Sequence, residues 1–339
     1  MNRSGEMKWL LKNGNVFKVD TESFENIDIM ISDEKISAIG KNIQALSDSI
    51  EIDCTGLIVS AGLVDIHTHL YEHATSLGVD PDTTCLANGV TTAIDGGSAG
   101  FMTFKGLKKF IVDKSCTRTL AFLHIACHGL AGAGCSGPEF GPGGESDHLN
   151  ALKINQCVKT IREHCDVIVG VKLRLDRNVT DDGNIEPEAL KRALAAAREA
   201  SLPLMLHHTM STLALEDVLA SLAPGDIYTH TFSSWAGEGN SIVNKEKREL
   251  RECVLEARKR GVLFDVGHGQ GSFDWEVAEI CAENNFYPDI ISTDLHSGNV
   301  GGAAKNLPWV MGKLLYLGNA IFHFSFSRCI RGRYFGFND

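Results

Sequence analysis

The chain has 339 residues, of which 43% are hydrophobic and 22% charged, so it can bury a large core and is not expected to be disordered. Its formal net charge of -11 repels nucleic acid and anionic lipid head groups, and neither is expected as a partner. No apolar run approaches the ~18 residues of a membrane-spanning helix, and no signal peptide opens the chain. The ten cysteines form no CxxC pair. The sequence therefore predicts a cytoplasmic protein with reduced cysteines.

Residues 7–60 contain short apolar runs separated by turn residues, which predicts a small β unit. One turn is expected at Gly14 and Asn15, between the apolar halves of KWLLKNGNVFKVD. A second turn is expected at residues 33–35, after a run in which apolar and polar residues alternate. No stretch of this region has the length or the period of a helix.

From residue 61 to residue 318, apolar strand-like runs alternate with helical stretches eight times. The first run is GLVDIHTHL at 62–70 and the last is DIISTDLH at 289–296. Repeated alternation of this kind predicts a parallel sheet with crossover helices. Eight units in roughly 250 residues are the size of a (β/α)8 barrel. No glycine-rich phosphate fingerprint follows the first strand, which argues against a dinucleotide-binding fold.

Residues that can bind a metal stand where the predicted strands end. In a (β/α)8 barrel these ends meet at one mouth, where active sites form. The two histidines of the His-Thr-His motif are two residues apart, so both point to the same side of their strand and can reach one cation. Neutral imidazole suits zinc and similar transition metals. The set comprises His67, His69, Lys172, His207 or His208, His230 and Asp294.

Most of these residues, taken singly, also have an interpretation that involves no metal. Lys172 follows an apolar strand, so its amine either extends to solvent or stays neutral and captures carbon dioxide as a carbamate. Only one of the adjacent His207 and His208 can face the barrel mouth, and His207 is preferred because it directly follows the apolar run. His230 alone would be read as a hydrogen-bonded core histidine. Asp294 needs a partner, since a buried charge is costly.

The motifs VDIHTH, VKLRL, LMLHH, DIYTH and STDLH, in this order, resemble those of the amidohydrolase superfamily. Longer stretches, including TTAIDGGSAG and GVLFDVGHGQGSFDWEVAE, resemble the dihydroorotase-like branch of amidohydrolase/deacetylase metallohydrolases. The resemblance covers residues 7–318. It implies a (β/α)8 barrel with a small N-terminal β-sandwich portion.

The resemblance also implies a binuclear site, usually of zinc. His67, His69 and Asp294 would hold the first ion, His207 and His230 the second, and Lys172 would bridge both as a carbamate. A metal-bound hydroxide would attack an amide or ester carbonyl, and Asp294 would accept its proton and pass it to the leaving group.

Two further residues are candidates for binding the substrate. His268 lies in a motif that matches the family at the end of the seventh strand. Arg174 is expected on the same side of its strand as Lys172, where it would bind a carboxylate or carbonyl. An equally supported interpretation is that Arg174 forms a surface salt bridge.

The resemblance stops near residue 318. Residues 319–339 are rich in aromatic residues and arginine and are expected to form a divergent tail. Relatives continue past the eighth strand and complete the sandwich, so here we expect an incomplete sandwich over residues 7–60 and a barrel over residues 61–318.

The sequence thus predicts a deacetylase-like hydrolase that removes an acyl group from a small molecule. The second hypothesis is hydrolysis of a cyclic amide, as in dihydroorotase or dihydropyrimidinase, because that reaction uses the same six ligands. A non-catalytic truncated relative is the third. The oligomeric state is open, a homo-oligomer included.

Overall fold

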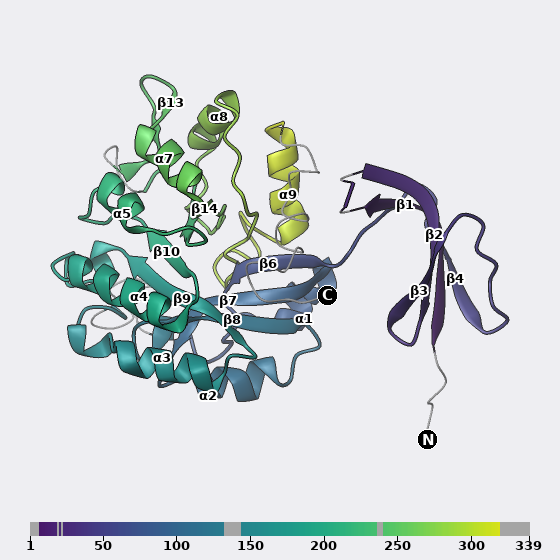
Figure 1. Cartoon of the computed structure of the whole chain (residues 1–339), viewed down its shortest axis with the longest axis horizontal. Helices are drawn as coiled ribbons and strands as arrows, with labels where there is room; N and C mark the ends of the chain where they lie inside the picture. The colour runs from purple at the N-terminus through teal and green to yellow at the C-terminus, as the bar shows by residue number, and fades with distance from the viewer. Residues whose placement is uncertain (1–6, 19, 22, 132–143, 236–239, 319–339) are drawn as a thin grey trace. The chain divides into compact units, whose positions relative to one another are not determined.

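The computed structural model describes residues 7–18, 20–21, 23–131, 144–235 and 240–318. It divides into two compact units, Met1–Gly62 and Leu63–Asp339, which are treated separately below (Figure 1). The tail predicted for residues 319–339 lies outside the described residues.

The first unit is one sheet of five strands in the order β3-β2-β1-β4, with β5 also paired to β1. Pairs β1–β2 and β2–β3 are antiparallel, whereas β4 and β5 run parallel to β1. The strand bounds are β1 Lys8–Lys18, β2 Ser23–Ser32, β3 Lys35–Gly40, β4 Ser49–Asp53 and β5 Ile58–Val59.

One of the two expected turns is wrong. Strand β1 continues through Gly14 and Asn15, and the glycine marks a β-bulge where the register with β2 shifts. Asn13 has a left-handed φ of 58°, and its backbone N–H donates to the buried Asp28 carboxylate at 2.8 Å. That carboxylate satisfies the amide that the bulge removes from the ladder, so the chain bends without reversing. The second turn is confirmed, with β2 and β3 joined at residues 33 and 34.

The outer strands of this sheet expose apolar side chains, among them Ile36 and Ile50. A second sheet packed on this one is absent from the part of the unit that the structure describes. The β-sandwich therefore stays a prediction.

The second unit is built on seven parallel strands in the order β14-β11-β10-β9-β8-β7-β6. A short antiparallel pair, β12–β13, lies apart from them. The strands are β6 Leu63–Thr68, β7 Val90–Gly100, β8 Arg118–His124, β9 Ile168–Leu175, β10 Leu204–His208, β11 Ile227–Thr229, β12 Val243–Asn244, β13 Glu249–Leu250 and β14 Leu263–Phe264.

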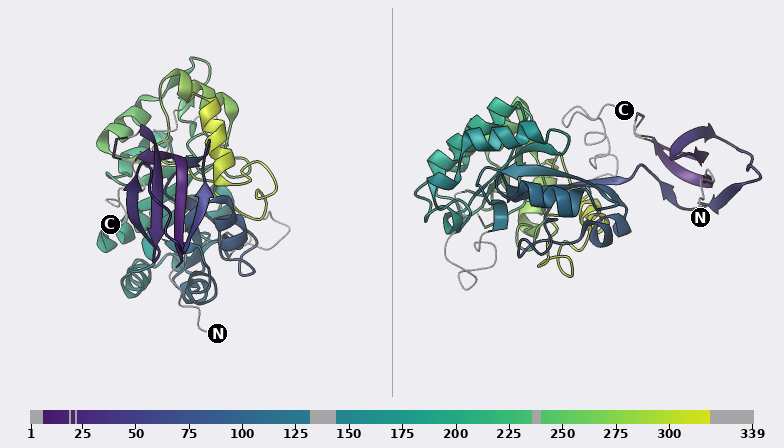
Figure 2. Two further views of the ribbon diagram at one scale, coloured as in Figure 1. Left: turned by 90° about the vertical axis from the view of Figure 1, so that its right-hand side faces the viewer. Right: turned by 90° about the horizontal axis from the view of Figure 1, so that it is seen from below.

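The helices of this unit lie outside its parallel sheet (Figure 2), and apolar residues fill the layer between them. Their bounds are α1 Pro81–Thr84, α2 Phe104–Leu107, α3 Ile154–Glu163, α4 Glu186–Ala200, α5 Leu215–Ser221, α7 Glu252–Arg260, α8 Trp275–Glu283 and α9 Leu307–Tyr316. Within the described ranges, no helix has the length and apolarity that crossing a membrane requires.

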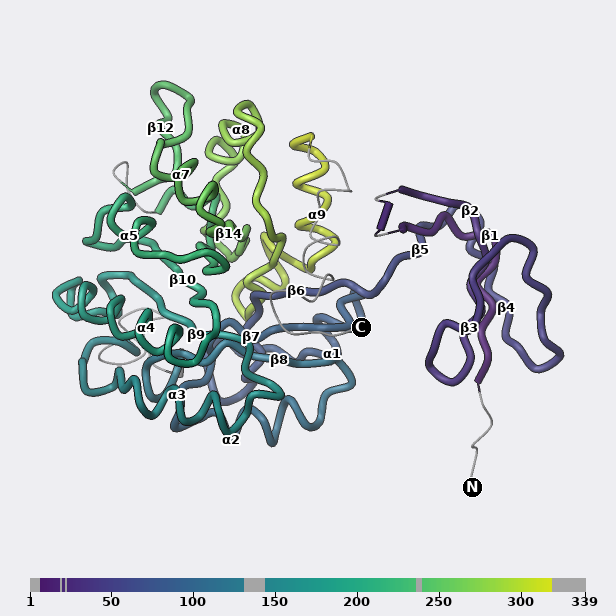
Figure 3. The backbone as a smooth tube through the Cα atoms, viewed as in Figure 1, coloured from purple at the N-terminus to yellow at the C-terminus, as the bar shows by residue number. Residues whose placement is uncertain are grey.

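Residues 289–295 link the two edges of the seven-stranded sheet. Leu295 forms a parallel bridge to Thr68 of β6, and Ile290 forms one to Asp265, which follows β14. The predicted eighth strand is therefore present as an irregular segment that pairs on both sides. Its path from α8 to α9 can be followed in Figure 3.

A second apolar cluster fills the inside of this ring of strands. It takes at least one residue from each of the eight segments, as the interior layers of a (β/α)8 barrel do. The sequence prediction of a parallel α/β barrel is confirmed at this level. The members are Ile66, Ile94, Leu120, Phe122, Val169, Met205, Ile227, Leu263 and Ile290.

Candidate metal centre

The residues predicted at the strand ends come together in one place. His67 and His69 end β6, and their Nε2 atoms lie 3.4 and 2.9 Å from Oδ1 of Asp294 in the eighth segment. Lys172 Nζ, from β9, lies 3.0 Å from His67 Nε2. On the other side, His230 Nε2 lies 2.8 Å from His207 Nδ1. The ring centroids of His67 and His230 are 5.3 Å apart, so the two groups adjoin.

Two of these residues have unusual backbone conformations. His230 has a φ of 64° and Asp294 a φ of 48°, both in the left-handed region that non-glycine residues rarely occupy. Strain of this kind persists only where the surroundings impose it, and it gathers at functional sites. His230 directly follows β11, and Asp294 directly precedes the bridge residue Leu295; both side chains contact the cluster.

The hydrogen-bond partners of two histidines show which ring nitrogen carries the hydrogen. His230 Nδ1 lies 2.6 Å from the carbonyl oxygen of Gly267, so this nitrogen carries the hydrogen. His67 Nδ1 contacts the hydroxyl of Thr229 at 3.0 Å, and that hydroxyl donates to Asp265 at 2.7 Å. His67 Nδ1 must therefore be the donor to Thr229. Both residues keep a lone pair on Nε2, the atom that faces the centre.

Burial keeps these imidazoles neutral. It lowers the pKa of His230 to about 4 and holds that of His67 well below its ordinary value. Neutral imidazoles and a carboxylate are ligands that divalent transition metals accept. The ligating atoms of His67, His69 and Asp294 all lie within 4.8 Å of one another, so this donor set fits a divalent cation.

Lys172 is 1% exposed, and burial lowers the pKa of its amine to about 8. Its side chain runs past β7, where two glycines leave room for the centre. A Cβ on Gly97 would lie 2.6 Å from Lys172 Cγ, and one on Gly96 would lie 2.4 Å from the His67 ring. The Gly-Gly pair is therefore required by the packing of the centre.

Sequence reasoning missed three buried acids that hold the centre in place. Asp95 accepts the backbone N–H groups of Leu70, Gly97 and Ser98 at 2.8, 3.0 and 2.6 Å. Asp265 accepts from the hydroxyls of Thr229 and Ser292, and Asp65 accepts from the hydroxyl and the backbone N–H of Thr293. Burial raises the pKa of Asp65 to about 7 and that of Asp265 to about 6. Each stands inside an apolar run, a pattern that predicts a partnered buried carboxylate.

His207 and His208 lie on opposite sides of β10, because successive side chains alternate along a strand. His207 lines the same cavity as His67 and Lys172. His208 is buried on the other side, with Nδ1 at 3.2 Å from the Tyr228 hydroxyl and Nε2 at 3.2 Å from the Leu213 carbonyl oxygen.

The cavity above the cluster has a volume of about 310 Å³. Arg174 lines it, and its guanidinium also forms a bidentate ion pair with the buried Glu145, at 2.7 and 2.8 Å. The apolar part of the wall comes from Leu77, Leu130, Met210 and Trp235.

His268, the other predicted substrate contact, is not among the residues that line this cavity. Its Nε2 lies 2.7 Å from Lys313 Nζ, and its ring stacks on Phe273 with centroids 4.6 Å apart. Gln270, Gly271 and Ser272, which follow it in the chain, do line the cavity.

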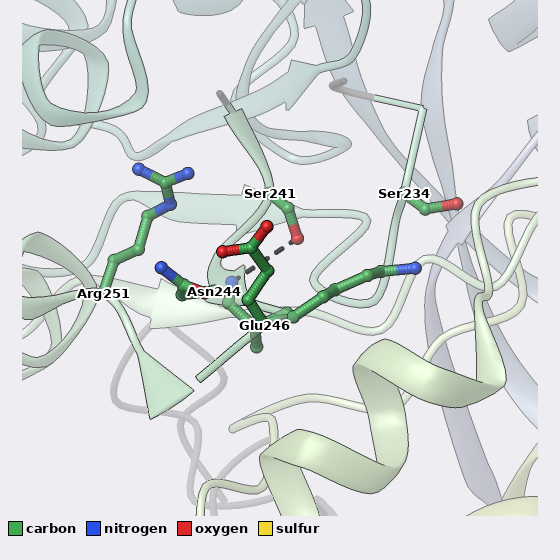
Figure 4. Close-up of a pocket in the computed structure, with 7 residues that line it drawn as sticks. Ser234, Ser241, Asn244, Glu246 and Arg251 are labelled. Carbon is green, nitrogen blue, oxygen red and sulfur yellow. Dashed lines mark hydrogen bonds between the residues drawn. The ribbon is translucent and has the colours of Figure 1, made fainter. Parts of the chain in front are cut away.

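A second cavity of about 370 Å³ lies beside the β12–β13 pair (Figure 4). Its two cations are paired with neighbouring acids, Lys245 with Asp274 and Glu276, and Arg251 with Glu216. We assign no chemistry to this cavity.

Comparisons with known proteins agree on the kind of protein that the chain resembles. It is 32% identical to a deacetylase of Agrobacterium fabrum over 294 residues, which are 86% of this chain and 69% of that protein. It is 33% identical to a deacetylase of Brucella anthropi over 289 residues, 85% of this chain and 69% of that one. A crystal structure of a dihydroorotase superposes with a TM-score of 0.82 at 29% identity, covering 94% of this chain and 80% of that chain. No protein-family model matches the chain.

Proposed function

Because the chain belongs to the amidohydrolase superfamily, we propose that it is a metal-dependent deacetylase that hydrolyses an acyl amide or ester bond of a small molecule. The observation that carries this proposal is the convergence of six side chains, from four strand ends and the eighth segment, on one buried centre. The deacetylases that share about a third of its residues support the reaction class.

The six side chains divide into two ligand sets. We propose that His67, His69 and Asp294 hold one divalent ion and that His207 and His230 hold the other. Lys172 would join the two sets as a carbamate, which requires a neutral amine and a site that keeps water away. Its burial keeps water away, and its pKa, lowered from 10.5 to about 8, raises the share of neutral amine. Zinc is the proposed metal, since imidazole and carboxylate suit it.

Bound ions would supply Lewis-acid chemistry, polarising the scissile carbonyl and lowering the pKa of water. The chain's own residues would do the rest. The Asp294 carboxylate faces the cavity and would take a proton from the attacking water and give it to the leaving group. Arg174, held by Glu145, would hydrogen-bond a carbonyl or carboxylate of the substrate. The apolar wall around Trp235 would limit the access of bulk water.

We place the protein in the cytoplasm, because the eight cysteines among the described residues carry no disulfide. A homo-oligomer remains part of the proposal on general grounds, since most soluble oligomers join identical chains.

The second candidate is hydrolysis of a cyclic amide, which is favoured by the superposition on a dihydroorotase. The two reactions can use the same ligands and differ only in the substrate that the cavity admits.

A hydrolysis screen separates these proposals. The enzyme, supplied with zinc or manganese and bicarbonate, is assayed on N-acetyl and O-acetyl derivatives of amino and hydroxy acids and on cyclic amides. Release of acetate supports the deacetylase, and ring opening supports the second candidate. Turnover in neither panel by a protein that binds metal would contradict both and favour a non-catalytic relative.

A further inference from the structure

A threonine and an aspartate lie beside Nε2 of His207, the ring nitrogen that does not contact His230, and like His207 they line the cavity. Thr209 Oγ1 lies 2.7 Å from His207 Nε2 and 3.1 Å from Oδ2 of Asp176. Thr209 is 4% exposed and Asp176 8%, so bulk water hardly competes for these hydrogen bonds. Both residues lie just beyond the strands that carry ligands, β10 and β9 respectively.

The direction of the hydrogen bonds is fixed from the aspartate. A carboxylate only accepts, and a hydroxyl has one hydrogen to donate. Thr209 must therefore donate to Asp176 and accept from His207. His207 Nε2 then carries the hydrogen, and Nδ1 keeps the lone pair.

The Asp176 carboxylate also forms hydrogen bonds within its own turn. Its Oδ1 already accepts the backbone N–H of Asn178 at 2.9 Å and the side-chain amide of Asn178 at 2.8 Å. The other oxygen is left to Thr209. The carboxylate is thus held by the turn that follows β9, and its orientation does not depend on the histidine.

The lone pair of His207 Nδ1 points at His230 Nε2, 2.8 Å away. That nitrogen also has a lone pair, because His230 Nδ1 donates to the Gly267 carbonyl. Two lone pairs at this distance repel unless a cation lies between or beside them. The pair therefore forms half of a cation site.

We infer that Thr209 and Asp176 are positioning residues that make His207 bind the second ion through Nδ1. The inference rests on the proposed two-ion function. The Thr229–Asp265 pair acts on His67 in the opposite sense, since it fixes the hydrogen on Nδ1 and leaves Nε2 as the ligand. Two Thr–Asp pairs thus select different ring nitrogens in the two halves of the centre.

The first test is Thr209→Val, which removes the hydroxyl and keeps the shape. Zinc binding to each site is measured by competition with a chelating indicator, with bicarbonate present. Loss of a partner behind a metal-binding histidine typically weakens metal affinity by roughly 10- to 100-fold. We expect a loss of this size for the second ion and none for the first. Thr209→Ser, which restores the hydroxyl, should recover the affinity.

The matched control is Thr119→Val. Thr119 is a buried threonine near the start of β8, and its hydroxyl donates only to the carbonyl oxygen of Thr117 in the bonds that the structure shows. Its replacement should leave both zinc affinities unchanged. Comparison of the two melting curves separates loss of folding from loss of the hydrogen bond.

Asp176→Asn gives a sharper test because it should reverse the hydrogen bonds. The amide oxygen has to stay where Oδ1 accepts two N–H groups from Asn178, so the NH2 group would face Thr209. Thr209 would then donate to His207 Nε2, and the hydrogen of the imidazole would move to Nδ1. We expect this variant to lose the second ion at least as completely as Thr209→Val.

The tautomer can be read directly from the 15N shifts of His207 in metal-free protein. The expected result is a protonated Nε2 in the wild type and a protonated Nδ1 in Asp176→Asn. Wild-type zinc affinity at both sites in Thr209→Val and Asp176→Asn would overturn the inference and leave the proposed function standing. A wild-type protein that binds no divalent ion would overturn both.

Discussion

The two halves of the centre differ in the charge that they bring. His67 and His69 face the carboxylate of Asp294, whereas His207 Nδ1 and His230 Nε2 contact each other, and neither ring forms an ion pair with a carboxylate among the described residues. The first half carries a negative charge to offset a divalent ion, and the second half supplies only neutral nitrogens. In the proposed two-ion centre, the second half would therefore need a negative charge from another residue. Lys172, with Nζ 3.0 Å from His67 Nε2, would supply it as the proposed carbamate.

Removal of the charge in the first half should have the largest effect. Asp294→Asn keeps the shape of the side chain but can neither offset an ion fully nor accept a proton. We expect kcat to fall by roughly 10²- to 10⁴-fold, the range for loss of a general acid–base group, together with weaker binding of the first ion. Steady-state kinetics and zinc content measure both. A variant with the activity of the wild type would show that the carboxylate is only a structural partner.

Removal of the Lys172 amine should affect metal binding in the two halves of the centre differently. Lys172→Met keeps the length of the side chain and cannot form a carbamate. The second ion should be lost while His67, His69 and Asp294 keep the first, so the zinc content should fall from about two per chain to about one. Wild-type protein depleted of bicarbonate should behave in the same way. Equal zinc content with and without bicarbonate would contradict the asymmetry.

A smaller effect is expected from the glycine that makes room for Lys172. Gly97 and Gly225 have φ values of 97° and 88°, so alanine is strained at both. Only at Gly97 would the added Cβ meet the lysine, at 2.6 Å, whereas nothing lies within 4 Å of Gly225. A displacement of about 1 Å near the reacting atoms can cost about 100-fold in rate. Gly97→Ala should therefore lose far more activity than Gly225→Ala, and similar losses would rule out this packing argument.

The smallest predicted effect is on stability without metal. Burial lowers the pKa of His230 from 6.5 to about 4, so the unfolded chain binds this proton first as the pH falls. The contribution of His230 to stability is complete above pH 6.5 and is lost progressively from there towards pH 4. His230→Asn should remove up to about 3 kcal/mol of this pH dependence. Denaturant unfolding at pH 7 and pH 4.5 measures it.

The control for this experiment is His73→Asn, because the His73 side chain is 91% exposed. It should leave the pH dependence unchanged. The raised pKa values of Asp65 and Asp265 act in the opposite direction over the same range, so the comparison must be made between variants and not on the wild type alone.

The sequence predicted the barrel because apolar runs that alternate with helices leave few other arrangements. It also predicted the six converging residues, since strand ends share one mouth in a barrel. It did not predict Thr209, Asp176 or Thr229, because hydroxyls and acids beside a strand end are common and only their distances show a function. The bulge at Asn13 was missed for a similar reason, since the Asp28 carboxylate that supports it comes from another strand.

The choice between Nδ1 and Nε2 of His207 was also beyond the sequence. That choice depends on a carboxylate whose orientation is set by Asn178, two residues further along the chain. The ion pair of Arg174 with Glu145 spans 29 residues, and no periodic pattern connects them.

The central claim, that the six residues form a two-ion centre of unequal halves, is tested most directly by crystallography. Anomalous difference maps recorded at the zinc edge, from crystals grown with zinc and bicarbonate, should show two peaks. One should lie among His67, His69 and Asp294 and the other at His207 Nδ1 and His230 Nε2, with density for a carbamate on Lys172 between them. A single peak, or peaks with an unmodified lysine, would contradict the account.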